Sequence, residues 1–320
     1  MNGRKANGAL EDNTGLKRLI NMEKGTVFGR TASSWAKILL FYVVFYAFLA
    51  SFWFACLMAF LSTLDDKMPR YYGKGTIIGI NPGVGYQPWL VEDPDSTLIK
   101  FNIRDQKSYQ KYVDTLNEYL KKYENKTDTR ICSDTESNAD LFKEGSPKLQ
   151  ALNGSDVPLA CQFNLTIFNE AGCGADNEYG FKNGQPCVFL LLNRLIAWKP
   201  VDFAVDSVPE IIRDRYKPNF ITFKCDGTSD FDKEHIGNLE YIPEAGIDGR
   251  YFPYTVLSNY HQPVAVVKFK NLPRNKVVLV ECRAYAQNIE HDVSSKLGLV
   301  NFELLIEDGE IEKNAAQRFR

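Results

Sequence analysis

The sequence predicts one membrane-spanning helix followed by a mainly β domain outside the membrane, folded as an antiparallel β-sandwich with one helix and long loops. Three observations predict this arrangement: a long uncharged segment near the N-terminus, an even number of cysteines beyond it, and alternating apolar residues in the C-terminal half. The average composition, with a net charge of −2 and 44% apolar residues, hides these differences. It does exclude a polytopic membrane protein, a disordered chain and a basic nucleic-acid binder.

Residues 38–64 form a run of 27 residues without a charged side chain. The hydrocarbon core of a bilayer is about 30 Å thick and needs roughly 20 helical residues, so this run is long enough to cross it. A buried helix of a soluble core is rarely so long, and the run starts too far from Met1 for a cleaved signal peptide. The sequence therefore predicts a transmembrane helix over residues 38–64.

The charges on the two sides of this span predict its orientation. Residues 1–37 carry seven basic and three acidic side chains, whereas residues 65–320 carry 31 basic and 37 acidic ones. Basic flanks stay on the cytoplasmic side. We therefore expect residues 1–37 to form a cytoplasmic tail and residues 65–320 an extracellular domain. This is the topology of a single-pass type II signal-anchor protein, whose span contacts membrane lipid.

Cysteine placement supports this topology. Cys56 lies in the span, and an even number of cysteines lies beyond it, as an oxidising compartment favours. The six are Cys132, Cys161, Cys173, Cys187, Cys225 and Cys282. They allow 15 pairings. Inward strand positions favour a bridge between Cys225 and Cys282, within one sheet or between sheets. The short separation of Cys173 and Cys187 suits a local loop closure. Cys132 and Cys161 are then left. Metal ligation is disfavoured, because no C-x₂-C pair is present.

Three N-x-S/T sequons, the acceptors of N-linked glycans, lie in the same predicted extracellular segment, at Asn125, Asn153 and Asn164. A single sequon is common by chance and carries little weight. Three independent features, namely charge bias, cysteine number and sequon placement, agree on one topology. The sequence therefore predicts a glycosylated, disulfide-bonded domain over residues 65–320.

Within this domain the first half is expected to contain few regular elements. Residues 65–100 are rich in Gly and Pro and predict an extended stalk. Apolar and Tyr positions then recur at three- and four-residue spacing over residues 109–123, which predicts an amphipathic helix. Residues 124–157 are polar and predict surface loops.

From about residue 159 the apolar pattern changes to a period of two. Alternation over residues 220–225, 277–285 and 301–308 predicts strands with one buried face. Residues 188–196 are almost all apolar and suit a strand covered on both faces. Several short strands separated by Gly and Pro turns predict an antiparallel β-sandwich.

No catalytic constellation is apparent in the sequence. The three histidines lack H-E-x-x-H spacing, no G-x-S-x-G turn occurs, and the acidic residues 226–234 lack the glycine of an EF-hand loop. Two D-x-D tripeptides, at 93–95 and 230–232, raise the possibility of a glycosyltransferase, but two matches are close to chance for this composition. We therefore expect no enzyme activity, no catalytic residue, no cofactor and no metal.

The span has an unusual aromatic content, since nine of its 27 residues are Phe, Tyr or Trp. Tyr42, Tyr46 and Trp53 lie at i, i+4 and i+11 and share one helix face. Aromatic belts belong at the membrane interfaces, and a Tyr hydroxyl inside the bilayer needs a hydrogen-bond partner. We expect this face to contact another membrane helix; the alternative is lipid-facing bulk with the tyrosines near the headgroups.

Several motifs in a consistent order resemble a known family. They are GRTASSWAKILLFYVVFYAFLASFW (29–53), SYQKYVDTLNEYLKKY (108–123), YGFKNGQPCVFLLLNRLIAWKP (179–200), YFPY (251–254) and FKNLPRNKVVLVECRAYAQNI (269–289). Together they resemble the β subunits of the animal Na⁺/K⁺-ATPase and of its gastric H⁺/K⁺ relative. The resemblance is poor over residues 71–100 and after Glu307.

This resemblance implies an immunoglobulin-like domain whose disulfides pair in sequence order. It implies a glycosylated, non-catalytic plasma-membrane subunit that forms a heterodimer with a P-type ATPase α subunit, assists its folding, assembly and delivery, and tunes K⁺ occlusion. A third small single-span subunit is a further candidate partner. The implied α contacts are Tyr42, Tyr46 and Trp53 on the span and Tyr251, Phe252, Pro253 and Tyr254 in the domain. The alternatives are a subunit of an H⁺/K⁺ pump and a cell-adhesion glycoprotein.

Overall fold

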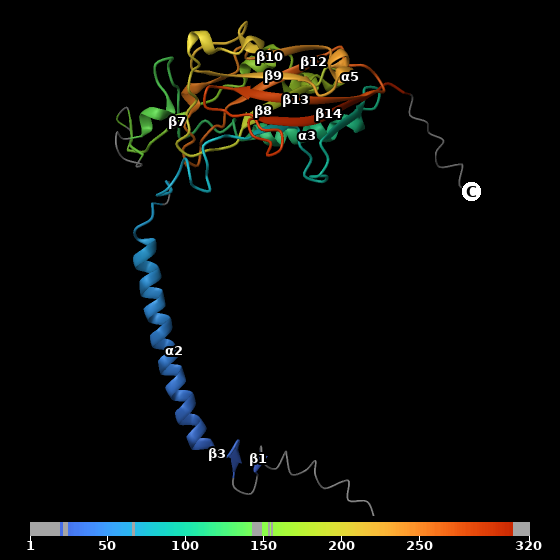
Figure 1. Cartoon of the computed structure of the whole chain (residues 1–320). Helices are drawn as coiled ribbons and strands as arrows, with labels where there is room; N and C mark the ends of the chain where they lie inside the picture. The colour runs from blue at the N-terminus through green and yellow to red at the C-terminus, as the bar shows by residue number, and fades with distance from the viewer. Residues whose placement is uncertain are drawn as a thin grey trace, which may run out of the picture. The chain divides into compact units, whose positions relative to one another are not determined.

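The computed structural model describes residues 20–21, 25–65, 68–142, 149–152, 154 and 156–309. The chain divides into two compact units, residues 1–65 and 66–320, which are described separately. In its described residues the first unit has three short strands and one long helix; Figure 1 labels β1, β3 and α2. These elements are β1 (Ile20–Asn21), β2 (Thr26–Val27), β3 (Arg30–Thr31) and α2 (Ala32–Leu61).

Helix α2 begins six residues before the predicted span and ends three residues before the end of it. Thr31 is the N-cap, and its hydroxyl oxygen accepts a hydrogen bond from the N–H of Ser34 at 3.4 Å. The uncharged run starts after Lys37, but the helix starts before this residue, because Lys is a good helix former. With 30 residues the helix is about 45 Å long, which is long and apolar enough to cross a membrane.

The second unit, called the β domain here, is built around two main sheets. The four-stranded sheet has the order β10-β12-β8-β4 and is antiparallel throughout. Its strands are β4 (Val84–Gln87), β8 (Cys187–Leu192), β10 (Asn238–Ile242) and β12 (Val264–Lys270). Strand β8 lies inside this sheet, and all but one of its residues are buried, as its apolar run predicts.

The five-stranded sheet has the order β11-β9-β13-β14-β5. All its pairs are antiparallel except β14 with β5. Its strands are β5 (Leu98–Asn102), β9 (Phe220–Gly227), β11 (Ile247–Asp248), β13 (Val277–Tyr285) and β14 (Leu299–Glu307). The predicted alternation is confirmed, since the buried residues are every second one along most of β13 and β14.

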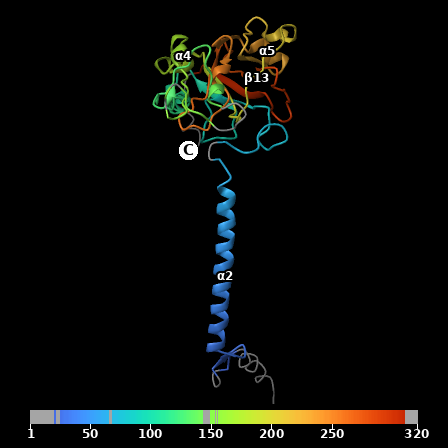
Figure 2. The same cartoon turned by 90° about the vertical axis from the view of Figure 1, so that its left-hand side faces the viewer.

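The two sheets pack face to face around one hydrophobic core. Phe302 of β14 contacts Tyr86 of β4 and Phe269 of β12, with ring centroids 5.0 and 6.0 Å apart, so these rings join the two sheets directly. The fold is therefore a mainly β sandwich with one long helix, as predicted. Figure 2 shows α4 (Thr166–Glu170) and α5 (Asp230–His235) on opposite sides of the domain.

Residues 65–100 are not the simple extended stalk that their glycines and prolines predict. They contribute β4, on the edge of the four-stranded sheet, and the start of β5, beside the last strand β14. Both strands are short, and their partner strands lie about 100 and 200 residues further along the chain, so no local sequence pattern predicts them. The polar segment 124–157 similarly contains β6 (Thr129–Arg130), which pairs in parallel with β7 (Ala160–Cys161).

The predicted helix is present as α3 (Gln106–Lys121). Asp105 caps it, since its carboxylate accepts a hydrogen bond from the N–H of Lys107 at 3.1 Å. The buried face of the helix carries Tyr109, Tyr112, Val113 and Leu116. These side chains hold the helix against β5 and the 3₁₀ segment η2 (Ala175–Asn183).

The remaining short helical segments lie in the loops of the β domain. They are η1 (Asn138–Leu141), η3 (Val205–Ser207), η4 (Glu210–Ile212) and η5 (Gly249–Tyr251).

Candidate interaction surfaces and modification sites

One face of α2 carries a row of exposed aromatic rings. The rings of Tyr42 and Tyr46 stack with centroids 6.1 Å apart, as i and i+4 positions on a helix allow. Trp53 lies further along the same face, and the three side chains are 50%, 59% and 64% exposed. None of the residues of α2 is buried within the described chain. This aromatic face, Tyr42, Tyr46 and Trp53, is therefore available to a partner in the membrane.

The second predicted contact segment, residues 251–254, follows β11 and is largely buried inside the domain; its last residue, Tyr254, forms a β-bridge with Ile196. Phe252 and Pro253 are buried, and the ring of Phe252 contacts Trp198 with centroids 5.4 Å apart. Tyr251 and Tyr254 are half-buried. Sequence reasoning could not separate these four positions, because their burial depends on distant segments. Only the two tyrosines present surface for a partner.

Each of the two tyrosines has a partner within the domain. The ring of Tyr251 contacts Phe163 with centroids 5.0 Å apart. The ring of Tyr254 contacts Tyr260 at 4.9 Å, and the guanidinium carbon of Arg194 lies 5.5 Å from its centroid. A partner that binds here meets aromatic edges and one cation rather than a flat apolar patch.

Three disulfides join consecutive cysteines of the β domain, which is the sequence order that the resemblance implies. The bridges are Cys132–Cys161, Cys173–Cys187 and Cys225–Cys282. The third joins directly opposite residues of β9 and β13, so it links neighbouring strands of one sheet rather than two sheets. The first joins the segment after β6 to the last residue of β7, and the second joins the segment after α4 to β8. Cys56 is unpaired and exposed on α2.

Two of the three sequons lie on exposed surface of the β domain, and the third, Asn153, lies outside the described residues. Asn125 follows α3, and its side-chain oxygen accepts a hydrogen bond from the N–H of Thr127 at 3.1 Å. Asn164 precedes α4, and its side-chain oxygen accepts one from the N–H of Thr166 at 3.0 Å. In each case the sequon threonine is held beside the asparagine.

Buried His261 connects the two sequon segments. Its Nδ1 accepts a hydrogen bond from the N–H of Phe163, the neighbour of Asn164, at 3.4 Å. Its Nε2 lies 3.0 Å from the backbone oxygen of Asn125, to which an Nε2–H donates. One imidazole therefore brings Asn125 and Asn164 to the same part of the surface. Sequence reasoning missed this residue because the histidines were searched only for metal and catalytic spacing.

The environment of His261 favours its neutral form. Burial lowers the pKa of the imidazole, the nearby charge of Lys122 acts in the same direction, and the hydrogen bond to the backbone oxygen of Asn125 opposes them. With one ring nitrogen accepting and the other donating, the neutral tautomer satisfies both neighbours. A proton on Nδ1 would face the N–H of Phe163 and break this contact.

The β domain is expected to lose stability as the pH falls below about 6.5, the pKa of an unperturbed histidine. The unfolded chain then binds a proton at His261 that the folded chain resists, so protonation favours unfolding, and this contribution is complete above that pH. Urea midpoints of the wild type and of His261→Gln, measured from pH 5 to pH 8, check this. The variant should show the weaker dependence below pH 6.5, and parallel curves would contradict the assignment.

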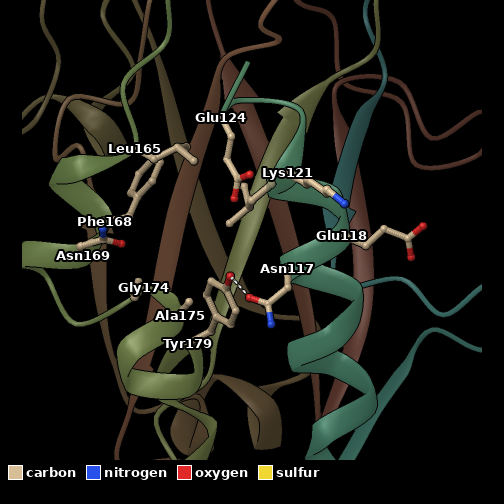
Figure 3. Close-up of a pocket in the computed structure, with 12 residues that line it drawn as sticks. Asn117, Glu118, Lys121, Glu124, Leu165, Phe168, Asn169, Gly174, Ala175 and Tyr179 are labelled. Carbon is tan, nitrogen blue, oxygen red and sulfur yellow. Dashed lines mark hydrogen bonds between the residues drawn. The ribbon is translucent and has the colours of Figure 1, made fainter. Parts of the chain in front are cut away.

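A groove of about 680 Å³ lies between α3 and the segment formed by α4 and η2 (Figure 3). Amide and carboxylate groups line it together with apolar side chains: Asn117, Glu118, Leu120, Lys121, Glu124, Leu165, Phe168, Asn169, Cys173, Gly174, Ala175 and Tyr179. The buried Tyr179 donates its hydroxyl hydrogen bond to the side-chain oxygen of Asn117 at 2.7 Å, which fixes that amide on the wall. The volume is in the range of small-ligand sites.

Among the residues that the structure describes, no group of three or more His, Cys, Asp or Glu side chains is arranged to hold a metal ion. The features that remain are surfaces and modification sites: the aromatic face, the half-buried tyrosines of residues 251–254, the disulfides, the sequons and the groove.

Comparison with known proteins identifies the family. A family model described as "Sodium / potassium ATPase beta chain" matches residues 8–302. The probable sodium/potassium-transporting ATPase subunit beta-3 of Caenorhabditis briggsae is 56% identical over 298 residues, which cover 93% of this chain and 88% of the relative.

More distant relatives match over similar lengths. Subunit beta-1 of Drosophila melanogaster is 30% identical over 322 residues, covering 96% of this chain and 99% of the relative. Subunit beta-2 of Homo sapiens is 34% identical over 271 residues, covering 82% and 83%. With a match from the first apolar helix to the last strand, this chain belongs to the sodium/potassium ATPase beta chain family.

Proposed function

We propose that this chain is the non-catalytic β subunit of a sodium/potassium-transporting ATPase and forms a heterodimer with the catalytic α subunit. The observation that carries the proposal is the exposed aromatic face of α2, together with membership of the β-chain family. Tyrosine hydroxyls within a bilayer gain from a hydrogen-bonding neighbour. A second membrane chain packed on this face supplies one.

The proposed topology is that of a type II plasma-membrane protein. Residues 1–37 form the cytoplasmic tail, residues 38–64 cross the membrane, and residues 65–320 form the extracellular domain. The basic flank of the helix supports this orientation. The three disulfides support it independently, since such bridges persist in oxidising compartments.

The proposed role has two parts. The β domain, rigidified by its disulfides, helps the α subunit to fold, assemble and reach the plasma membrane. Once assembled, it favours the K⁺-occluded conformation by binding it more tightly than the other conformations, and it shifts the equilibrium only by that difference in affinity. Lipid covers the parts of α2 that the α subunit leaves free, and a third small single-span subunit is a further proposed neighbour.

Co-purification in mild detergent tests the heterodimer. Affinity capture of the full chain should recover an α subunit in stoichiometric amount. Changing Tyr42, Tyr46 and Trp53 together to leucine should reduce that recovery, because these variants remove the rings of the aromatic face. The matched control changes Phe48, Phe52 and Phe54 to leucine, because none of these residues lies on the aromatic face. Capture of the wild-type chain alone, or equal losses in both triple variants, would contradict the proposal.

Removing only the hydroxyls tests the role in K⁺ binding. The double variant Tyr42→Phe, Tyr46→Phe is expected to assemble normally but to lower the apparent K⁺ affinity about two- to tenfold, since a hydrogen bond contributes about 0.5–1.5 kcal/mol. The measurement is the K⁺ activation curve of ATPase activity in membranes that contain equal amounts of heterodimer. Phe48→Leu is the control. A K⁺ curve that matches the wild type at normal assembly would refute this role for the hydroxyls.

A further inference from the structure

We propose that the groove between α3 and α4 is the seat of the first sugars of an N-linked glycan on Asn164, and that a glycan on Asn125 starts from the rim of the same groove. The inference rests on the extracellular location of the β domain proposed above. It assigns an occupant to a hollow of about 680 Å³ that the chain itself does not fill.

Both attachment points are direct neighbours of groove-lining residues. Asn164 precedes Leu165, and Asn125 follows Glu124. Figure 3 shows Leu165 and Glu124 at the same end of the groove, on opposite walls. The imidazole of His261 contacts the backbone at both sequons and holds these two walls together. Two sites that are 39 residues apart in the sequence thus open onto one hollow.

Both asparagine side chains are exposed, and a hydrogen bond to each amide oxygen fixes the orientation of the amide. Each amide oxygen accepts the N–H of the sequon threonine, at 3.0 Å for Asn164 and 3.1 Å for Asn125. The glycan is attached to the other atom of the amide, the nitrogen. Because both asparagines are exposed, an attached sugar meets solvent on one side and the groove wall on the other.

The groove wall has the chemistry that an N-acetylhexosamine needs. Asn117 and Asn169 offer amides, and Glu124 offers a carboxylate, to the hydroxyl and acetamido groups of a sugar. Leu165 and its apolar neighbours cover the C–H face of the ring. Because Tyr179 fixes the amide of Asn117, at least one of these polar groups is already ordered before a sugar arrives.

A covalently attached sugar needs only weak contacts to stay in the groove. Attachment one residue from the wall converts binding into an intramolecular step with a high effective concentration, in the millimolar range for short flexible tethers. A free saccharide of the same affinity would not compete with it. The groove is therefore better suited to the chain's own glycan than to a soluble ligand.

Site-resolved deglycosylation tests this seat. The full chain is produced with an α subunit in animal cells, and peptide N-glycosidase release is followed by mass spectrometry at Asn125 and Asn164. We expect release from Asn164 at least tenfold slower on the native complex than on the denatured chain, and slower than at Asn125.

Variants that fill the groove test whether it is the source of this protection. Ala175→Trp fills the groove from an exposed position and should remove this protection. Asn169→Trp fills it from α4, on the same wall, and Glu170→Trp, exposed and outside the lining, should leave the protection unchanged.

Each alternative outcome is informative. Fast release from Asn164 on the native wild type, or protection that persists in both groove-filling variants, would overturn the seat while leaving the topology intact. An unoccupied Asn164 beside an occupied Asn125 would overturn it in the same way. Glycan at none of the three sequons would contradict the extracellular location itself, and with it the proposed function.

Discussion

Replacing Cys225 and Cys282 together by alanine is expected to lower the free energy of unfolding of the β domain by about 4 kcal/mol. The bridge spans 57 residues, the longest of the three separations, and closing a loop of that length in the unfolded chain accounts for a loss of this size. Both sulfurs lie in the core between β9 and β13, so alanine leaves no unpaired polar group. A loss of this size is a large share of the stability of a typical domain, about 5–15 kcal/mol.

The comparison variant is Cys56→Ala, which removes the free and exposed cysteine on α2 and should leave unfolding unchanged. Urea unfolding of the detergent-solubilised protein, followed by tryptophan fluorescence, measures both. In cells, the double variant should be retained inside the cell, while Cys56→Ala reaches the surface. Equal urea midpoints for the double variant and the wild type would show that strand pairing alone holds this sheet together.

Truncating Phe181 to alanine is expected to cost about 3–5 kcal/mol, the range found for large aromatic residues in cores. Its ring is fully buried and contacts Phe101 of β5 at 5.0 Å and Tyr112 of α3 at 5.6 Å between centroids. The ring of Tyr109 lies 6.5 Å away. The ring of Phe181 therefore packs where η2, α3 and β5 meet, and alanine leaves a cavity among these three elements.

The comparison variant is Tyr71→Ala, an aromatic truncation at a position that is 73% exposed. It should change the urea midpoint little, because surface substitutions are usually within about 0.5 kcal/mol. Hydrogen exchange should localise the effect of Phe181→Ala, with faster exchange along α3 than along β12. A uniform increase over the whole β domain would show that the aromatic cluster is not a local support of α3.

The sequence predicted the elements whose signal is local. The period-two alternation identified β9, β13 and β14, and the three- and four-residue spacing identified α3, because one face of each is buried along its whole length. The uncharged run identified α2 because it is long and apolar enough to cross a bilayer, although the helix starts earlier than the run does. The inward positions of Cys225 and Cys282 favoured their pairing, and the structure shows that the bridge links neighbouring strands of one sheet.

Features that depend on distant contacts could not be predicted. Strands β4 and β5 are short, lie among glycines and prolines, and are defined by partners far along the chain. Phe252 and Pro253 were predicted to contact a partner, yet the structure buries them, and only the fold distinguishes them from the adjacent tyrosines. The proximity of Asn125 and Asn164 depends on His261, which comes from a third segment.

Strand β14 has a consequence for how this domain is made. It lies between β13 and β5 and pairs Glu303 with Leu98. A strand from the start of the domain therefore pairs with the last strand of the domain. During synthesis β5 emerges early and stays without its partner until the final strand has left the ribosome. Until then β5 is not connected to β13, β9 and β11, because β14 lies between them in the sheet. A chain that stops before β14 therefore exposes two open strand edges at once, on β13 and on β5, and open edges of this kind are sites at which a chain pairs with other chains.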